Sequence, residues 1–211
     1  ARFSFRPSLY DTVQWMGYGL PEDRKAVVGS DHVIRLEVED VPALAREEHM
    51  PPDSEVQMRA EFFYVANNPE TTEAYWKRIG KAQFKSFENY LEKDGAMRKA
   101  VNEIISASDP PETKLRKIYA RVQQIRNLSF ERSKSEREEK RENLKVNNHV
   151  EDVWARGYGT ALQINLFFAT LARAAGFPAD LAILSARNKY FFKREMPDAR
   201  QLNANAVLVR V

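Results

Sequence analysis

The chain has 211 residues, 43% of them hydrophobic and 11% aromatic, a composition that excludes a disordered chain. It contains no cysteine, and its three histidines show no HxxxH spacing, so we expect no disulfide, thiol catalysis, metal site or cofactor. Its 33 Lys and Arg are interspersed with 30 Asp and Glu, and no apolar run approaches ~20 residues, which argues against a nucleic-acid partner and against membrane insertion.

Residues 1–66 show the alternation that is typical of a β-sheet. Apolar and charged side chains alternate in the runs 32–40 and 56–65, so one face of each run can be buried. Prolines between the runs mark connections, because proline cannot donate to a strand ladder. We therefore expect a β-rich domain over residues 1–66, of which this chain holds the C-terminal part.

Helical periodicity follows the break at Asn67–Thr71. Apolar residues recur at helical intervals from Tyr75 to Leu91, from Ala96 to Ile105 and from Thr113 to Ile125. The first of these helices should stop at Asp94–Gly95. Asp109 is a candidate N-cap of the third helix, which should end near Asn127.

Two segments rich in charge have more than one interpretation. The stretch Glu131–Glu142 has alternating charges that nearly cancel, which is typical of a solvated loop or a short exposed helix, and the alternative is a regulatory or partner-binding insert. The segment Asn188–Arg194 mixes aromatic rings with cations. It is either a loop whose rings cover an edge of the core or a surface that stacks on bases or sugars.

The C-terminal third is more apolar. A short helix is expected over residues 147–156, followed by a turn at 157–160 whose Thr160 is a candidate N-cap. Residues 161–175 are apolar on nearly all sides and predict a buried helix, which Gly176 and Pro178 end. Strands are expected at 179–185 and 204–211, with a connecting segment between them.

The segment Val150–Pro178 resembles the core of the transglutaminase-like superfamily, whose architecture is similar to that of papain-like proteases. The resemblance rests on the motifs at Val150–Trp154, Gly157–Ala161 and Leu171–Ala179, and the later strand at Asn205–Val209 resembles the one that carries the family's histidine. It implies an α+β fold in which a helix-plus-antiparallel-sheet domain occupies residues 70–211, without the family's final strand.

The residues upstream are similar to known bacterial proteins as well. Asp40–Ala43, Glu47–Glu48 and Met50–Pro52 resemble the end of a β-rich domain of unknown function that often precedes bacterial transglutaminase-like domains. This resemblance implies a bacterial protein with an extracytoplasmic or periplasmic location.

Two departures from the family pattern bear on function. The family's catalytic cysteine aligns with Ala161 and its histidine with Ala206. A methyl group can neither become a thiolate nor shuttle a proton, so the resemblance implies a chain that has lost catalysis. The same alignment places Ala161 in the first turn of the buried helix, facing a strand that carries Ala206.

We therefore expect a non-catalytic binding or scaffolding module whose partner is a peptide, a protein or a glycan such as a cell-envelope polymer. One alternative is a transglutaminase or protease-like enzyme of the cysteine type whose active residues are lost or replaced here. Another is a structural spacer with a filled cleft. The candidate ligand-binding residues carry hydroxyl or amide groups: Tyr158, Thr160, Gln163, Asn203 and Asn205.

Overall fold

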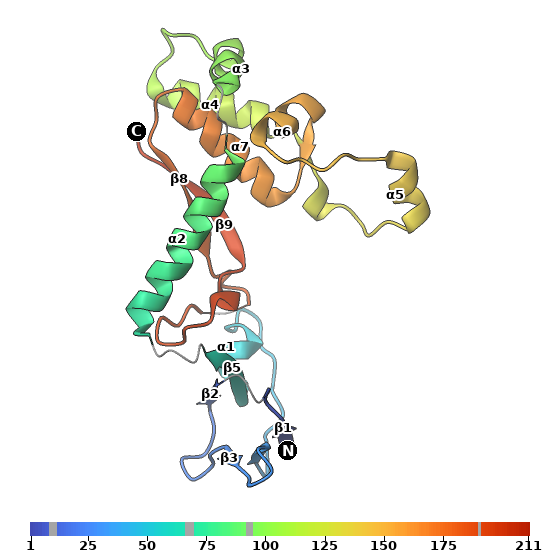
Figure 1. Cartoon of the computed structure of the whole chain (residues 1–211), viewed down its shortest axis with the longest axis vertical. Coiled ribbons are helices and arrows are strands. Elements are labelled where there is room, and N and C mark those ends of the chain that lie inside the picture. The colour runs from blue at the N-terminus through green and yellow to red at the C-terminus, as the bar shows by residue number, and fades with distance from the viewer. Residues whose placement is uncertain (9–11, 66–69, 92–94, 190) are drawn as a thin grey trace. The chain divides into compact units, whose positions relative to one another are not determined.

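The computed structural model describes residues 1–8, 12–65, 70–91, 95–189 and 191–211 (Figure 1). Contacts divide the chain into two compact units. Unit 1 comprises Ala1–Ile79 and Ser185–Asn203, and unit 2 comprises Gly80–Leu184 and Ala204–Val211. Helices and antiparallel strand pairs are both present, which confirms the expected α+β class.

The two units differ from the expected division at residues 66 and 70, because the segment 185–203 packs within unit 1. The carboxylate of Glu55 accepts a hydrogen bond from the backbone N–H of Phe191, and Trp76 donates to the carbonyl of Arg194. The expected breaks at 67–69 and at Asp94 lie outside the described residues. No helix in the described part of the chain is long and apolar enough to cross a membrane.

Unit 1 contains two small antiparallel sheets. The first has the order β1-β4-β3 and the second pairs β2 with β5. In β4 the side chains of Ile34 and Leu36 are buried while Arg35 and Glu37 are exposed, as the sequence alternation predicts. The regular elements of this unit are β1 (Arg2–Phe5), β2 (Thr12–Tyr18), β3 (Val27–Val28), β4 (Ile34–Glu37), α1 (Asp53–Val56), β5 (Arg59–Val65) and the 3₁₀ turn Ala199–Gln201.

An aromatic cluster joins the two sheets of unit 1. The ring of Phe62 on β5 stacks on Phe3 of β1 at a centroid distance of 4.9 Å and lies 5.9 Å from Phe5. Trp15, the cross-strand partner of Phe62, lies 6.5 Å away in a second stacked arrangement. Such cross-strand aromatic pairs stabilise a sheet beyond the area that they bury.

Unit 2 is built around one buried helix, α7 (Figure 1). Within the 19-residue helix α2, the change from unit 1 to unit 2 falls between Ile79 and Gly80. The helices are α2 (Thr72–Tyr90), α3 (Ala96–Ile104), α4 (Pro111–Val122), α5 (Glu136–Glu142), α6 (Val150–Arg156) and α7 (Ala161–Ala174). The strands are β6 (Arg126–Asn127), β7 (Tyr158–Gly159), β8 (Ala179–Leu184) and β9 (Ala204–Val209).

The core of unit 2 lies where α3, α4 and α6 pack against α7. Phe167 and Leu171 of α7 are completely buried, which agrees with the apolar pattern of residues 161–175. The surrounding helices contribute the side chains of Met97, Ile118, Val150 and Val153. On another side of α7, the antiparallel pair β8–β9 covers Ala169 and Ala172.

The start and the end of α4 differ from the sequence prediction. The helix ends at Val122, before the expected end, because Arg126–Asn127 forms β6 and pairs in parallel with β7. Its N-cap is Pro110, and the expected cap Asp109 forms an ion pair with Lys117 at 2.7 Å instead. Proline is compatible with this position because the first N–H groups of a helix have no partner within the helix.

The charged stretch 131–142 contains the short exposed helix α5, one of its two expected structures. Its charges form local ion pairs. Glu131 pairs with Arg126 and with Lys134, and Arg126 holds the pKa of Glu131 down, with help from Lys134, to about 2. Arg132 likewise holds the pKa of Glu138 at about 2.

These two ion pairs predict how Glu131 and Glu138 titrate, both in the intact chain and after each arginine is replaced. Carbon-13 NMR should show Glu131 and Glu138 titrating near 2, below the ordinary value of 4.5. Since both folded-state pKa values are depressed, the pairs stabilise the segment fully above pH 4.5, and this stabilisation is lost as the pH falls toward 2. Arg126→Met should raise the pKa of Glu131 but not that of Glu138, and Arg132→Met should raise the pKa of Glu138 but not that of Glu131. Equal shifts at both sites in either variant would contradict the assignment.

The packing around α7 predicts a large difference between two phenylalanine substitutions. Phe167→Ala should lower the free energy of unfolding by roughly 3–5 kcal/mol, because it leaves a cavity in the core of unit 2. Phe84 on α2 is 59% exposed, so Phe84→Ala should change the stability by less than about 0.5 kcal/mol. Urea unfolding followed by circular dichroism measures both, and similar losses would show that the core is placed incorrectly.

Candidate functional site

The N-terminus of α7 is where the sequence places a lost active site. Thr160 is the N-cap, as predicted, and its Oγ1 accepts a hydrogen bond from the N–H of Gln163 at 3.3 Å. In return, Gln163 Oε1 accepts from the N–H of Thr160 at 3.0 Å. The N–H of Ala161 donates to Ser129 Oγ at 2.9 Å. Three backbone donors at this end of α7, where a helix has no partners of its own to offer, are therefore bonded within the chain.

The remaining polar groups beside this end of α7 hold a neighbouring segment. Gln163 Nε2 donates to the carbonyl of Asn147 at 3.2 Å, and the buried Asn147 amide donates to the carbonyl of Tyr158 at 2.8 Å. The Tyr158 hydroxyl donates to the carbonyl of Lys145 at 3.0 Å and accepts from its N–H at 2.9 Å. Tyr158 and Gln163 thus fasten the chain before α6.

The phase of β9, that is, which of its alternating side chains face α7, differs by one residue from the expected one. Asn165 Nδ2 donates to Asn205 Oδ1 at 2.6 Å, so the side chain of Asn205 faces α7. Val207 packs on the same side, whereas Ala206 is exposed. The expectation that Ala206 faces the start of α7 is therefore wrong, because side chains alternate along a strand and the odd positions face the helix.

Of the five candidate ligand residues, the structure brings Tyr158, Thr160 and Gln163 together at the start of α7. Asn205 lies beside Asn165, farther along the same helix. Asn203 belongs to unit 1, where its Oδ1 accepts from the N–H of Ala186 at 2.8 Å. The five residues do not form one site.

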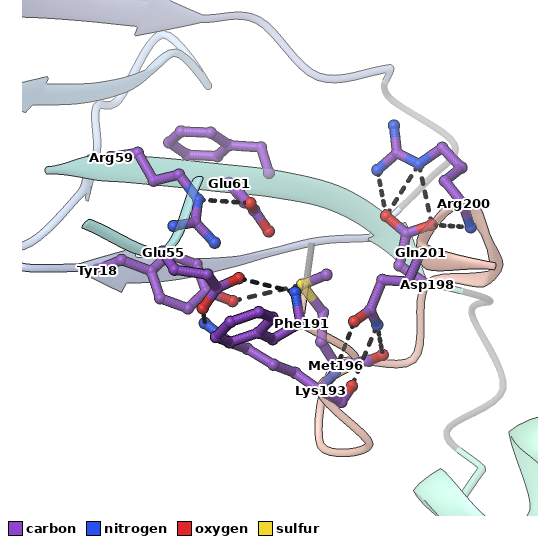
Figure 2. A pocket seen from close by; sticks show the side chains of 11 residues that line it. Tyr18, Glu55, Arg59, Glu61, Phe191, Lys193, Met196, Asp198, Arg200 and Gln201 are labelled. Atoms are coloured by element: carbon purple, nitrogen blue, oxygen red, sulfur yellow. Dashed lines mark hydrogen bonds and ion pairs between the residues drawn. The ribbon is translucent and has the colours of Figure 1, made fainter. Parts of the chain in front are cut away.

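A pocket of about 290 Å³ in unit 1 was not predicted from the sequence (Figure 2). It is lined by the end of β2, by α1, by β5 and by the segment 191–201, all of which belong to unit 1. Its apolar lining comes from Phe62, Phe191 and Met196, and its polar lining includes three carboxylates and three cations.

Each carboxylate of the pocket is paired with one of the cations. Glu55 lies 3.1 Å from Lys193 Nζ. Burial raises the pKa of Glu55, but the N–H of Phe191 and the ammonium of Lys193 outweigh this effect and hold that pKa below its ordinary value. The other two pairs are Arg59 with Glu61 at 2.7 Å and Arg200 with Asp198.

Tyr18 lies between two of these cations, Arg59 and Lys193 (Figure 2). The guanidinium carbon of Arg59 lies 3.8 Å from the ring centroid of Tyr18, and Lys193 Nζ lies 3.9 Å from it. Burial raises the pKa of the Tyr18 hydroxyl, and the nearby Glu61 carboxylate raises it further, so the hydroxyl stays protonated at neutral pH. It donates a hydrogen bond to Met196 Sδ at 3.6 Å.

Gln201 fixes the segment that closes the pocket. Its side chain is 5% exposed and makes three hydrogen bonds to the backbone of this segment. Oε1 accepts from the N–H of Lys193 at 2.8 Å, while Nε2 donates to the carbonyls of Lys193 at 3.1 Å and Met196 at 2.8 Å. A buried amide with all these partners holds the loop in one conformation.

One donor in the pocket lacks a partner. Arg59 Nη1 is buried and has no hydrogen-bond partner within the described ranges, while Arg59 Nε is bonded to Glu61 Oε1 at 2.7 Å. The Arg59 side chain as a whole is 18% exposed. Leaving a buried donor unpaired costs about 1–3 kcal/mol, and more for a charged group.

The sequence offered one signal for this pocket. The segment Asn188–Arg194 was singled out for its aromatic and cationic residues, and Phe191 and Lys193 of that segment line the pocket. Tyr190, which precedes Phe191, lies outside the described residues. In the parts of the chain that the structure describes, no three His, Asp or Glu side chains are placed to hold a metal ion.

No protein-family model matches the sequence, and no curated protein sequence matches it. A crystal structure of a protein from Parabacteroides distasonis ATCC 8503, described as a "putative protease", is similar in fold, with a TM-score of 0.59 and 17% sequence identity. The similarity covers 99% of this chain and 37% of that chain. At this identity the likeness shows the fold alone, and the transglutaminase-like assignment remains a prediction from sequence.

The phase of β9 predicts coupling between two asparagines. Asn205→Ala should destabilise the chain by roughly 1 kcal/mol, because the half-buried amide of Asn165 loses its 2.6 Å side-chain acceptor and keeps only the Asn205 carbonyl at 3.4 Å. A double-mutant cycle with Asn165→Ala, measured by urea unfolding, should give a coupling energy of about 0.5–3 kcal/mol. Ala206→Ser on the exposed face serves as the neutral control. Additive losses in the cycle would place the Asn205 side chain elsewhere.

Proposed function

We propose that this chain is a non-catalytic domain of the transglutaminase-like type that acts as a binding or scaffolding module for a peptide or a cell-envelope polymer. The observation that carries the proposal is the start of α7. The family's nucleophile position holds the methyl group of Ala161, and the N–H of this residue is bonded to Ser129. This is a capped helix end without a nucleophile.

The hydroxyl groups nearby do not replace the missing thiol. A serine or threonine nucleophile needs an adjacent base to take its proton. Thr160 Oγ1 and Ser129 Oγ both accept hydrogen bonds from backbone N–H groups, and within the described residues neither donates to a base. His149, the nearest histidine in the sequence, is the N-cap of α6. These contacts favour a structural role for this end of α7.

An enzyme of the cysteine type, with its active residues lost or replaced in this chain, is the second candidate. The fold likeness to a structure described as that of a "putative protease" favours it. A catalytic relative would need a cysteine at position 161 and an imidazole on the side of β9 that faces α7. In this chain that side of β9 carries Asn205, whose Oδ1 accepts a hydrogen bond from Asn165. The bacterial, extracytoplasmic setting of the proposal rests on the sequence resemblance.

The proposal predicts that the chain does not turn over peptides. Incubation with a glutamine-containing peptide and a primary amine should give no amine incorporation, no deamidation and no cleavage by mass spectrometry, because nucleophile and base are both absent. Steady turnover by the purified chain, abolished by Ser129→Ala or Thr160→Val, would instead establish a hydroxyl nucleophile and reject the proposal.

A second prediction tests whether α7 retains the electrostatics that cysteine chemistry uses. The thiol created by Ala161→Cys should have a pKa below the ~8.5 of a free thiol, because the N-terminus of a helix stabilises the thiolate. The pH dependence of alkylation by iodoacetamide measures this value. Ala206→Cys on the exposed face of β9 is the matched control and should titrate near ~8.5. Equal pKa values for the two thiols would remove the physical basis of the resemblance.

A further inference from the structure

The pocket of unit 1 contains charged groups but carries no excess charge. Its three carboxylates and three cations are paired, so an incoming anion meets Glu55 and Glu61 as well as Arg59 and Lys193. An ion of either sign would have to break one of these pairs and leave a partly buried charge without a partner, which is costly. The charge balance therefore favours a ligand that is polar but uncharged.

The Arg59 guanidinium indicates what the polar part of the ligand offers. It lines the pocket and is held in place by its stacking on Tyr18 and its bond to Glu61. Its Nε is bonded to Glu61 and its Nη1 is buried, so Nη2 is the remaining nitrogen through which Arg59 can donate to a ligand. A carbonyl oxygen that enters beside the guanidinium is a suitable acceptor, because a hydrogen bond from a charged donor is stronger than one between neutral groups.

The aromatic rings of the pocket have neighbours on their faces. Arg59 and Lys193 lie over the ring of Tyr18, Phe3 and Trp15 stack on Phe62, and the guanidinium of Arg187 lies 5.4 Å from the centroid of Phe191. A sugar ring or a base binds by stacking on an open aromatic face. The apolar lining of the pocket comes from Phe62, Phe191 and the flexible Met196 side chain, which adapts to an aliphatic side chain.

We propose that this pocket binds an uncharged peptide segment, with the Arg59 guanidinium donating to a backbone carbonyl of the peptide and an aliphatic side chain of the peptide inserted against Phe62, Phe191 and Met196. The volume of about 290 Å³ lies just below the ~300–1,000 Å³ that is usual for ligand pockets. The pocket therefore accommodates one or two residues of the peptide.

The pocket is formed before any ligand arrives. Gln201 fixes the backbone at Lys193 and Met196 through three hydrogen bonds, and Glu55 fixes the N–H of Phe191. A ligand then need not order this segment, which lowers the entropic cost of binding. The proposal rests on the binding role proposed above, and it assigns that role to unit 1 and not to the capped start of α7.

The test uses acetyl-leucine methylamide as the probe and the intact chain labelled with nitrogen-15. Titration should shift the backbone amides of residues 191–201 in a saturable manner, with a dissociation constant in the millimolar range that is typical of so small a ligand. Arg59→Met should weaken this binding roughly tenfold or more, since it removes a charged donor. Arg46→Met, whose arginine pairs with Asp53 and is 75% exposed, is the matched control and should bind as the unaltered chain does.

Two further probes decide the ligand class. Acetyl-leucine, which ends in a carboxylate, and N-acetylglucosamine should both bind more weakly than the methylamide. Tighter binding of the carboxylate would show that the pocket selects anions, and equal or tighter binding of the sugar would show that it takes glycans. Either result overturns the proposal, as does unchanged affinity in Arg59→Met.

Should Arg59→Met fail to fold, the titrations of the unaltered chain still decide. Saturable shifts confined to residues 191–201 and their neighbours in the pocket support the proposal, and the lack of such shifts at tens of millimolar probe rejects it. This failure is distinct from failure of the proposed function. Turnover of a glutamine-containing peptide would reject the non-catalytic role and leave the titration unaffected.

Discussion

Helix α7 has apolar side chains on nearly its whole circumference, and the arrangement of unit 2 follows from the need to cover them. Phe167 and Leu171 are fully buried against α3, α4 and α6, while Ala169 and Ala172 allow β8 and β9 to approach closely. The first N–H groups of any α-helix have no partner within the helix itself. The first turn of α7 is therefore held by the reciprocal bonds between Thr160 and Gln163.

That constraint also affects how the resemblance to an enzyme family is interpreted. A buried helix whose N-terminus points at a strand is a suitable place for a thiolate, because the backbone amides and the helix dipole favour negative charge there. In this chain the same amides of Thr160, Ala161 and Gln163 are bonded to internal oxygen atoms. The same backbone arrangement can therefore carry a catalytic thiolate or form the capped end of a structural helix. Which of the two it does depends on the side chains.

The sequence predicted the elements whose signal is local. The all-apolar run predicted α7, the Thr160 cap was correct, and the alternation in 32–40 predicted the buried side of β4. It did not predict which side of β9 faces α7, since both Ala206 and Asn205 are compatible with either face. Val207 and Val209 decide the phase by packing on α7, and this is a tertiary contact that the strand's own alternation does not contain.

The pocket of unit 1 could not be predicted for a related reason. Tyr18, Arg59 and Lys193 are far apart in the sequence, and they meet only because the segment 185–203 packs within unit 1. The sequence around each of these three residues is typical of an ordinary surface residue. The mixture of rings and cations at residues 188–194 is unusual, and it predicted that the segment covers an edge of the core or stacks on a ligand. The sequence of the segment does not show on which strands it packs.

The two places considered for function differ in how completely their polar groups are satisfied. At the start of α7 the backbone donors of Thr160, Ala161 and Gln163 each have an internal partner, so a ligand would have to displace an existing bond to use any of the three. In the pocket of unit 1, Gln201 and Glu55 hold the surrounding backbone firmly, and the Arg59 side chain lines the space beside it. Arg59 Nη1 is itself buried without a partner among the described residues, so it lowers the stability of unit 1 and does not serve a ligand. A ligand in this pocket can bind to groups that already lie at its surface, whereas a ligand at the three donors of α7 competes with bonds that the free protein already makes.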